Sequence, residues 1–257
     1  MEAKDMEAKI TSVYDEGAVE GTPLIGAEGF SVLIEIGSNK ILFDTGRRGR
    51  YLLNNMSFLD IKPEEIGKVV ISHGHKGHTG GVDDLLKNRE TPLYIYASPT
   101  SLETKNLLGQ RGTIVSEEQS EKADIIEIKD WTEIDDKVFV SFPMDIGGGL
   151  DEAFMVILSR KGPIVISACS HAGVDKVMEA VKDKFGEYPH GYVGGVHVVK
   201  KDKAKAAAIA SIFQEKKCTK LYLNHCTGVS GIMYIRVILG LKGVNDFYVG
   251  SSLYVDL

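Results

Sequence analysis

Three histidines lie within six positions of one another in the segment 72–81, which reads SHGHKGHTGG. They are His73, His75 and His78. Imidazole nitrogens bind zinc, iron or manganese-type centres, and side chains two positions apart at the end of a strand can point to the same side. We therefore predict that His73 and His75 share one metal ion and that His78 points to a neighbouring metal position. A solvated loop that is rich in histidine by chance is the alternative interpretation.

The histidine cluster needs a rigid element to hold it, and the residues before it supply one. Residues 68–72 form a short apolar run, KVVIS, which predicts a buried strand. Two more histidines, His171 and His225, follow the predicted strands 164–167 and 220–224. The C-terminal ends of strands are where α/β proteins usually assemble their sites. We therefore expect five histidines from three distant segments to converge.

Strand and helix signals alternate along the rest of the chain. Residues 29–36 and 40–44 are β-rich runs around a turn and predict a hairpin. Further strands are expected at 93–96, 124–128, 138–142, 154–158 and 191–199, and helices at 48–59, 174–185 and 204–217, the last with Asp202 as its cap. This order favours an α/β fold in which two sheets pack together under helices, in one domain spanning residues 1–257.

The composition favours a cytoplasmic protein without a polyanionic partner. The chain has 257 residues with 36 acidic and 30 basic side chains, so its net charge of −6 gives no reason to expect nucleic acid. Its three cysteines lack the paired spacing of a structural zinc site and fit a reducing compartment. No apolar run approaches the roughly 20 residues that span a bilayer, so we expect no membrane segment.

Four motifs, taken in order, resemble those of the metallo-β-lactamase superfamily. They are ILFDTG at 41–46, SHGHKGHTGG at 72–81, CSHAG at 169–173 and HCTG at 225–228. With GGVH at 194–197, the last two resemble the branch of 7,8-dihydropterin-6-methyl-4-(β-D-ribofuranosyl)-aminobenzene-5′-phosphate synthase. The motifs span nearly the whole chain. The resemblance implies an αββα four-layer sandwich of the metallo-β-lactamase type, with the metals at one edge between the sheets.

The same resemblance implies a role for each of the clustered histidines. His73 and His75 would bind the first metal, whereas His78 and His225 would belong to the second. His171 would be an additional ligand, which either completes the first site or takes over the bridging position that an aspartate has in many members. The cofactor would be one or two divalent ions, with zinc as the first candidate and iron or manganese as alternatives.

Four further residues near these motifs have candidate roles. Asp44 would orient the metal ligands from behind, although Asp-Thr-Gly after a strand can also be a simple turn. His197 is a candidate catalytic residue for acid–base chemistry or substrate contact, with a structural histidine as an equal alternative. Cys169 could line the site, but we interpret both Cys169 and Cys226 as buried, inert thiols.

One position departs from the superfamily pattern in a way that matters for metal binding. The usual motif has an aspartate two residues after its second histidine, where this chain has Gly77, preceded by Lys76. Glycine offers no ligand, so the second site loses a carboxylate. If Lys76 points inward, its ammonium also repels a dication by about 1 to 4 kcal/mol at about 4 Å. We therefore predict a weak or empty second site.

These residues and the resemblance together predict a metal-dependent hydrolase-type enzyme. Its substrate would be a small molecule, phosphorylated or pterin-like, attacked by a metal-activated water. The alternative is a catalytically impaired metal- or ligand-binding protein of the same fold, in which Gly77 marks the loss of activity. A homodimer could form through the predicted helix 232–241 or the apolar end 249–257, although packing within the domain explains both segments equally well.

Overall fold

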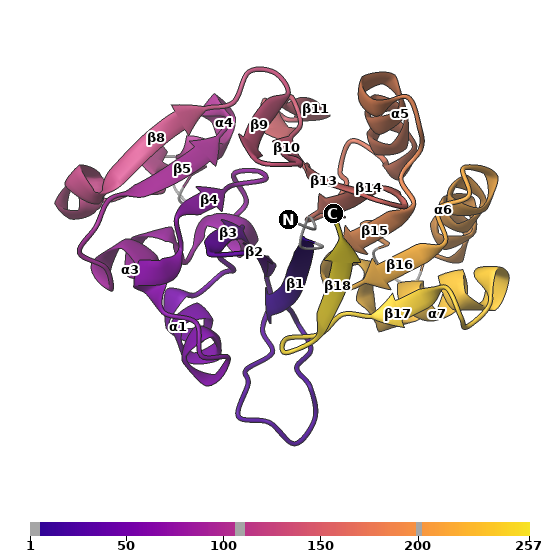
Figure 1. Ribbon diagram of the computed structural model, residues 1–257, viewed down its shortest axis with the longest axis horizontal. Helices are drawn as coiled ribbons and strands as arrows, with labels where there is room; N and C mark the ends of the chain where they lie inside the picture. Colours follow the sequence, from indigo (N-terminus) through magenta and orange to yellow (C-terminus); the bar gives the residue numbers. More distant parts are fainter. Residues whose placement is uncertain (1–5, 106–110, 199–201) are drawn as a thin grey trace, which may run out of the picture. The chain divides into compact units, whose positions relative to one another are not determined.

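The chain forms two compact units in the computed structural model, which describes residues 6–105, 111–198 and 202–257. Each unit contains one seven-stranded sheet with its own helices (Figure 1). The first unit comprises Met1–Asp130, Phe142–Ala153 and Tyr248–Asp256, and the second comprises Trp131–Ser141, Phe154–Phe247 and Leu257. Two large sheets with helices confirm the α/β class, whereas the single domain over residues 1–257 stays a prediction.

The sheet of the first unit consists, in spatial order, of β18 (Ser252–Asp256), β1 (Glu7–Tyr14), β2 (Ser31–Ile36), β3 (Asn39–Phe43), β4 (Lys68–Val70), β5 (Leu93–Ala97) and β8 (Ala123–Glu127). Pairing is antiparallel from β18 to β3 and parallel from β3 to β8. Phe43 of β3 pairs with Val70 of β4. Because these parallel strands end level with each other, the residues that follow them meet at one edge of the sheet.

Two helices, α1 (Gly49–Phe58) and α3 (Val82–Lys87), pack against this sheet in one hydrophobic core. Leu52 of α1, Leu85 of α3 and Val69 of β4 are all fully buried in it. Burying one such side chain stabilises the fold by about 1.5–3 kcal/mol, so this core fixes the strand that precedes the histidines. The shorter elements of the unit are η1 (Pro63–Glu65), α2 (Lys76–Thr79), α4 (Pro99–Leu102), β6 (Glu103–Lys105), β7 (Arg111–Thr113), η2 (Glu117–Lys122), β11 (Met144–Gly147) and β12 (Leu150–Glu152).

The sheet of the second unit consists, in spatial order, of β17 (Val244–Asp246), β16 (Lys220–Leu223), β15 (Gly191–Gly194), β14 (Gly162–Ser167), β13 (Met155–Ser159), β10 (Val138–Val140) and β9 (Thr132–Asp135). Its helices are α5 (Val174–Phe185), α6 (Lys203–Glu215), η3 (His225–Thr227) and α7 (Gly228–Leu239). Strands β14 to β17 are parallel, and Ser167, Gly194 and Leu223 lie in register. Three loops therefore leave this sheet at the same edge.

The helices agree closely with their predictions. The predicted helix 48–59 is α1 at Gly49–Phe58, 174–185 is α5 over the same residues, and 204–217 is α6 at Lys203–Glu215. The carboxylate of Asp202 accepts a hydrogen bond from the Lys205 N–H at 2.9 Å, which confirms Asp202 as the cap of α6. None of the helices in the described ranges combines the length and apolar character that a bilayer-spanning segment needs.

Among the predicted strands that are shorter in the structure, two lie at the candidate site. The prediction 68–72 ends at Val70 in β4, and 191–199 ends at Gly194 in β15, with residue 199 outside the described range. In both cases the chain leaves the sheet before the histidine. The site residues are therefore on loops that begin at strand ends, and the sheets supply the rigid support beneath them.

Candidate metal centre

The loop that follows β4 brings three histidines together within the first unit. His73 is fully buried, His78 is 2% exposed, and His75 is exposed. The ring centroids of His73 and His78 lie 4.1 Å apart, and His73 Nε2 lies 2.9 Å from His75 Nδ1. The sequence cluster is thus also a spatial cluster, with His75 on its outer side.

Asp44, at the end of β3, holds this loop from behind. Its fully buried carboxylate accepts hydrogen bonds from the Ser72 backbone N–H and the Ser72 hydroxyl, both at 2.7 Å. Asp44 Oδ2 also lies 2.7 Å from His78 Nδ1. The Ser72 hydroxyl lies 2.9 Å from His73 Nδ1 on its other side. One carboxylate therefore orients two of the three histidines, one of them through a serine.

When His73 and His78 are neutral, as metal ligands must be, these contacts determine where their ring protons lie. An ionised carboxylate only accepts, so His78 donates to Asp44 through Nδ1–H. The single hydroxyl proton of Ser72 goes to Asp44, so Ser72 accepts from His73 Nδ1–H. Both histidines then carry an unprotonated Nε2, which is the state that binds a metal. The donor set fits a divalent metal. His75 Nδ1–H would donate to His73 Nε2, and an ion bound at His73 Nε2 would displace only this one hydrogen bond.

Asp44 has an unusual backbone conformation that suits this role. Its φ is 61°, in the left-handed region that non-glycine residues seldom adopt, although aspartate and asparagine tolerate it better than most. Its N–H donates to the Val70 carbonyl at 2.8 Å, so the turn is tied to the neighbouring strand. Such strained positions concentrate at functional sites. A simple Asp-Thr-Gly turn, the alternative interpretation, does not account for the three hydrogen bonds of the side chain.

Gly77 and Lys76 have different consequences for the predicted second metal position. A Cβ built on Gly77 meets only the Gly29 Cα, at 3.5 Å, which is an ordinary van der Waals distance. A Cβ therefore fits at position 77, so crowding of this atom does not explain why the chain has glycine here. Lys76 is exposed, so its ammonium is screened by water and its repulsion falls toward the lower end of the expected range.

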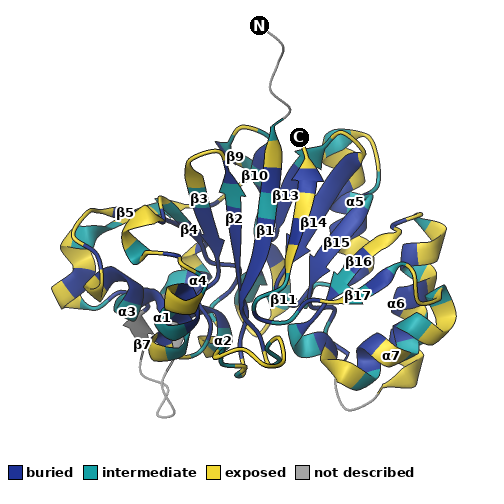
Figure 2. Ribbon diagram, turned by 60° about the horizontal axis from the view of Figure 1, so that its bottom comes forward, coloured by how far each residue is buried: buried dark blue, intermediate teal, exposed yellow. Residues whose placement is uncertain are grey.

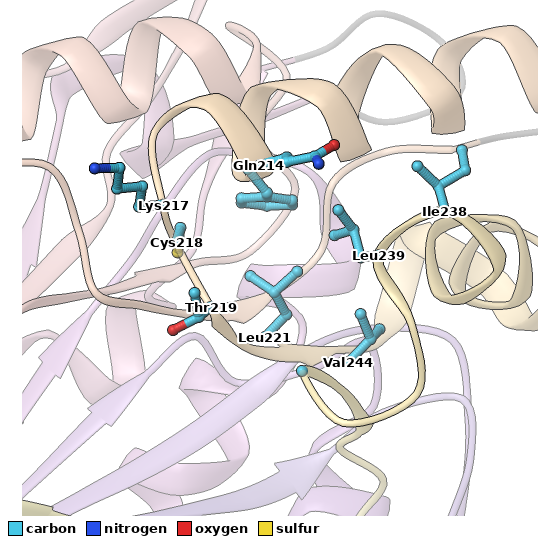
Figure 3. A pocket seen from close by; sticks show the side chains of 10 residues that line it. Gln214, Lys217, Cys218, Thr219, Leu221, Ile238, Leu239 and Val244 are labelled. Carbon is cyan, nitrogen blue, oxygen red and sulfur yellow. The ribbon is translucent and has the colours of Figure 1, made fainter.

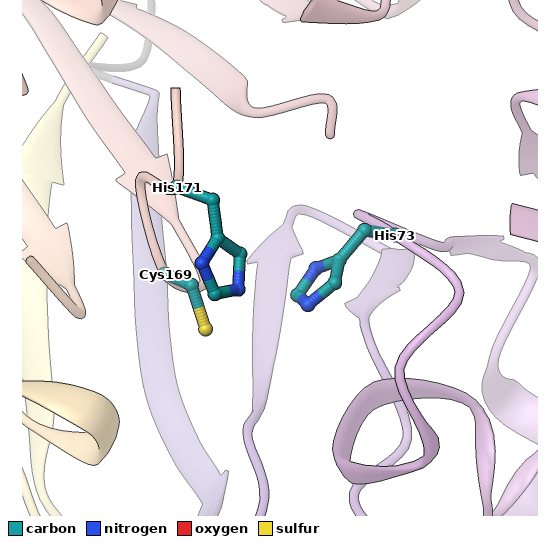
Figure 4. Close-up of side chains that lie close together, drawn as sticks. All are labelled: His73, Cys169 and His171. Atoms are coloured by element: carbon teal, nitrogen blue, oxygen red, sulfur yellow. The ribbon is translucent and has the colours of Figure 1, made fainter. Parts of the chain in front are cut away.

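In the second unit, Cys169 and His171 lie on the segment that follows β14. Ser170 between them is 5% exposed and has a φ of 55°. Its hydroxyl donates to the Gly195 carbonyl at 3.1 Å and contacts the Tyr192 hydroxyl. With Ser170 held inward in this way, the side chains of Cys169 and His171 point to the same side of the segment, as Figure 4 shows. The same figure shows His73 on its own loop in the first unit.

His197 and Cys226 leave the same sheet edge, after β15 and β16. One ligand atom each of Cys169, His197 and Cys226 lies within 4.8 Å of the other two. Cys226 Sγ also accepts the His197 backbone N–H at 3.3 Å. A Cβ on Gly195 would lie 2.5 Å from Cys226 Sγ, so only glycine permits this approach. The second unit thus holds a compact group of two thiols and one imidazole.

The Cys226 thiol is acidified by this group. Burial alone would raise its pKa, but hydrogen bonds with the Cys169 and His197 side chains and the nearby charge of His225 hold the pKa of Cys226 well below its usual value. The remaining cysteine behaves in the opposite way, because burial raises the pKa of Cys218 to about 12. Cys218 therefore has the environment of an inert thiol, whereas Cys226 does not.

His171 and His225 both lie next to Cys169. The ring centroids of His171 and His197 lie 4.3 Å apart. The Sγ of Cys169 lies within 4.8 Å of a ring nitrogen of His171 and also of one of His225. His225 has a φ of 47° and His197 a φ of 51°, so both are held in the left-handed region. Cys169 is the common neighbour of the ligand-type side chains of the second unit.

The structure arranges the predicted site residues in two groups, one in each unit. His73, His75, His78 and Asp44 form the first, and His171, His197 and His225 belong to the second. Sequence reasoning assigned no role to Ser72, although a hydroxyl directly before a candidate ligand was a usable signal. It also interpreted Cys169 and Cys226 as buried, inert thiols. Cys226 is only partly buried, and both lie beside candidate ligands.

A pocket elsewhere in the second unit does not belong to this chemistry. It has a volume of about 280 Å³ and lies between the end of α6, β16 and α7 (Figure 3). Leu221, Leu239 and Val244 give it a mainly apolar wall, and its one thiol is that of Cys218. None of the candidate histidines lines it. The pocket therefore supplies neither metal ligands nor a reactive nucleophile.

Known proteins resemble this chain in sequence. Residues 25–145, which include Asp44 and the histidine loop, match the model of the metallo-beta-lactamase superfamily. Over this part of the chain, slightly less than half of it, the sequence is similar to the metallo-β-lactamase superfamily. It is 28% identical over 260 residues to 7,8-dihydropterin-6-methyl-4-(beta-D-ribofuranosyl)-aminobenzene-5′-phosphate synthase of Methanocaldococcus jannaschii, which covers 86% of this chain and 87% of the relative. The resemblance of the motifs to this branch is thus confirmed as a sequence similarity.

Solved structures of the superfamily confirm the fold. The crystal structure of Tm1679, a metal-dependent hydrolase of the β-lactamase superfamily, is 25% identical with a TM-score of 0.79, and the match covers 97% of this chain and 100% of that chain. The metallo-β-lactamase fold protein YhfI from Bacillus subtilis has a TM-score of 0.67 at 17% identity, with coverage of 96% and 99%. The superfamily fold implies a divalent metal, and the histidine and cysteine groups above are candidates to hold it.

Replacing Asp44 with asparagine should weaken metal binding by this protein about 10- to 100-fold while leaving the fold intact. Asparagine keeps the shape of the side chain and tolerates the left-handed backbone. Its amide cannot accept all three hydrogen bonds, so His73 and His78 lose their fixed orientation. Competition with a chromophoric chelator measures the zinc affinity, and an unchanged affinity in Asp44→Asn would show that the carboxylate has no orienting role.

Proposed function

We propose that the protein is a metal-dependent, hydrolase-type enzyme that acts on a small phosphorylated or pterin-like molecule. The observation that carries this proposal is the pair of contacts that Asp44 makes with the histidine loop, directly with His78 and through Ser72 with His73. Asp44 and Ser72 hold His73 and His78 so that the Nε2 atoms of both rings are unprotonated. A loop that is histidine-rich by chance has no reason to contain such buried, oriented rings.

Five histidines are assigned to the metal in this proposal. His73, His75 and His78 come from the first unit, and His171 and His225 come from the second. Zinc is the first candidate and iron or manganese the alternatives, with one or two ions bound. A bound divalent metal activates water for attack and neutralises charge on the attacked group. His171 either completes the first position or bridges the two.

The other residues of the site orient groups or move protons. Asp44 keeps the rings of His73 and His78 in place through direct and serine-mediated hydrogen bonds. His197, whose ring lies beside that of His171, is proposed to give a proton to the leaving group. His75 is exposed, and His171 and His197 are partly exposed, so a small molecule can reach these side chains from solvent.

The proposed substrate class is supported by the relatives. The name of the Methanocaldococcus jannaschii protein combines a dihydropterin with a phosphate ester, and Tm1679 is called a metal-dependent hydrolase. A panel of phosphoesters, thioesters and dihydropterin precursors, offered to the zinc-, iron- and manganese-loaded protein, tests the proposal. We expect metal-dependent turnover of a phosphorylated or pterin-containing member. Turnover of none of them by any metal form would overturn it.

A second candidate function is that of a metal- or ligand-binding protein without turnover. The observation that favours it is Gly77, which removes a carboxylate ligand although the site has space for one. This candidate predicts that pterin-like ligands bind to the metal-loaded protein and are recovered unchanged. Turnover that requires His73 would exclude it.

A homodimer through α7 is a further part of the proposal. Val229, Met233 and Val237 of α7 are 65%, 57% and 81% exposed and lie four residues apart, so they share one face of the helix. Figure 2 shows exposed residues of α7 in yellow. A contiguous exposed apolar stripe marks a contact surface, and pairs of identical chains are the commonest assemblies. The partner proposed is therefore a second copy of this chain.

Replacing Val237 with glutamate should convert the dimer to a monomer, since two buried carboxylates would face each other across the symmetric contact. Light scattering coupled to size exclusion measures the mass. Val19→Glu is the control, because Val19 is also an exposed apolar residue, at 38%, but belongs to the first unit. A wild-type monomer, or a dimer that persists in Val237→Glu, would contradict the proposed contact.

A further inference from the structure

Two cysteines and one histidine of the second unit form a group that the proposed hydrolase site does not use as a unit. Cys169 Sγ, Cys226 Sγ and a ring nitrogen of His197 all lie within 4.8 Å of one another. They come from three loops, far apart in sequence, that leave the parallel strands β14, β15 and β16 at one edge. The parallel strands β14, β15 and β16 therefore position all three side chains.

The backbone around Cys226 packs closely against its sulfur atom. Gly195 admits the Cys226 sulfur where any Cβ would collide with it, and the same Cβ would lie 2.4 Å from the Ala168 carbonyl. The His197 backbone N–H points at Cys226 Sγ, which is the kind of hydrogen bond that supports a metal-bound thiolate. His197 Nδ1 is buried and has no hydrogen-bond partner among the described residues. A buried ring nitrogen beside two thiols lacks the polar contact that such atoms normally have.

We propose that Cys169, Cys226 and His197 bind a thiophilic divalent cation, zinc first, through a set of ligands that includes none of the three histidines of the histidine loop. Two thiolates and one imidazole are three of the four ligands of a tetrahedral zinc site, and a fourth position stays open to solvent or to substrate. Binding releases the two thiol protons to solvent, so the cation gains two anionic ligands. Iron and cobalt accept the same donor set.

A metal at this site would change the role proposed for His197. The bound imidazole would keep one N–H and could donate a hydrogen bond to the leaving group, but it could not give up a proton as an imidazolium does. The new site needs none of His73, His75 or His78. Its failure and the failure of the proposed hydrolase function are therefore separable in one set of variants.

Cobalt substitution of the whole chain tests the proposal, because thiolate ligands give cobalt(II) a charge-transfer absorption in the near ultraviolet that imidazole ligands do not. We expect wild-type protein to show this absorption on titration with cobalt(II). Cys226→Ser should lose about half of its intensity and weaken cobalt binding at this site at least about tenfold, since one of two thiolates is gone. Cys169→Ser should behave in the same way.

The matched control is Cys218→Ser, which removes a buried thiol from the same unit but outside the group and should leave the absorption unchanged. The double variant His73→Ala/His75→Ala should also retain it. Full absorption in Cys226→Ser would overturn the proposal. So would its complete loss in His73→Ala/His75→Ala, because the thiolate would then belong to the histidine-bound metal.

Discussion

Replacing His73 with alanine is expected to abolish metal-dependent turnover, with a loss of at least about 1000-fold in kcat/KM. A bound divalent metal supplies several kcal/mol of transition-state stabilisation, and each 1.36 kcal/mol is a factor of about ten in rate. His73 is fully buried, and its Nδ1 contacts the Ser72 hydroxyl, so its Nε2 is the nitrogen proposed to bind the metal. Initial rates on the best substrate of the panel, with metal in excess, measure the effect.

This experiment must distinguish activity lost because the variant unfolds from activity lost because a metal ligand is missing. His75→Ala is the second variant, because His75 is exposed and its removal leaves the core intact. His190→Ala is the control, since His190 lies in the second unit outside both groups of candidate ligands. We expect the thermal midpoint of His75→Ala to match the wild type and its activity to fall steeply. Full activity in both His73→Ala and His75→Ala would rule out the histidine loop as the metal site.

Replacing Gly77 with aspartate is expected to add about one metal ion per chain and to raise phosphodiesterase activity. The second metal position lacks a carboxylate, and an anionic oxygen restores both a ligand and a charge. Position 77 has room for the side chain, since the nearest atom to a built Cβ is 3.5 Å away. Elemental analysis and phosphodiesterase assays of wild type and variant, prepared in parallel, measure both effects.

An isosteric control isolates the charge in this comparison. Gly77→Asn introduces nearly the same shape with no negative charge, so it should gain neither the ion nor the activity. If wild type already binds as many ions at the histidine site as Gly77→Asp does, another group replaces the missing carboxylate. The predicted weakness of the second position would then be wrong.

The candidate histidines could be selected from the sequence because each follows a strand signal. The apolar run before His73 and those before His171 and His225 predict strands, and strand ends at one edge of a sheet collect side chains from distant segments. The structure has β4, β14 and β16 at these places. The fold class followed from the same alternation of strands and helices. Periodicity and strand position are local properties, so sequence carries them well.

The residues that orient the site could not be found in this way. The contact of Ser72 with both Asp44 and His73 depends on the in-register ends of β3 and β4. The low pKa of Cys226 depends on the side chain of Cys169, which is 57 residues away in the sequence. Positive φ values at Asp44 and His197 are set by tertiary contacts, because neither residue type demands them. A sequence pattern contains none of these relations.

The most direct test of the central claim is the metal content that depends on the histidine loop. Wild type and His73→Ala/His75→Ala are stripped with a chelator, reloaded with zinc, desalted and compared by elemental analysis. The account predicts that the double variant retains about one zinc ion per chain less than wild type and loses turnover with it. Equal zinc content in the two proteins would contradict the account, because the oriented imidazoles of His73 and His75 would then hold no metal.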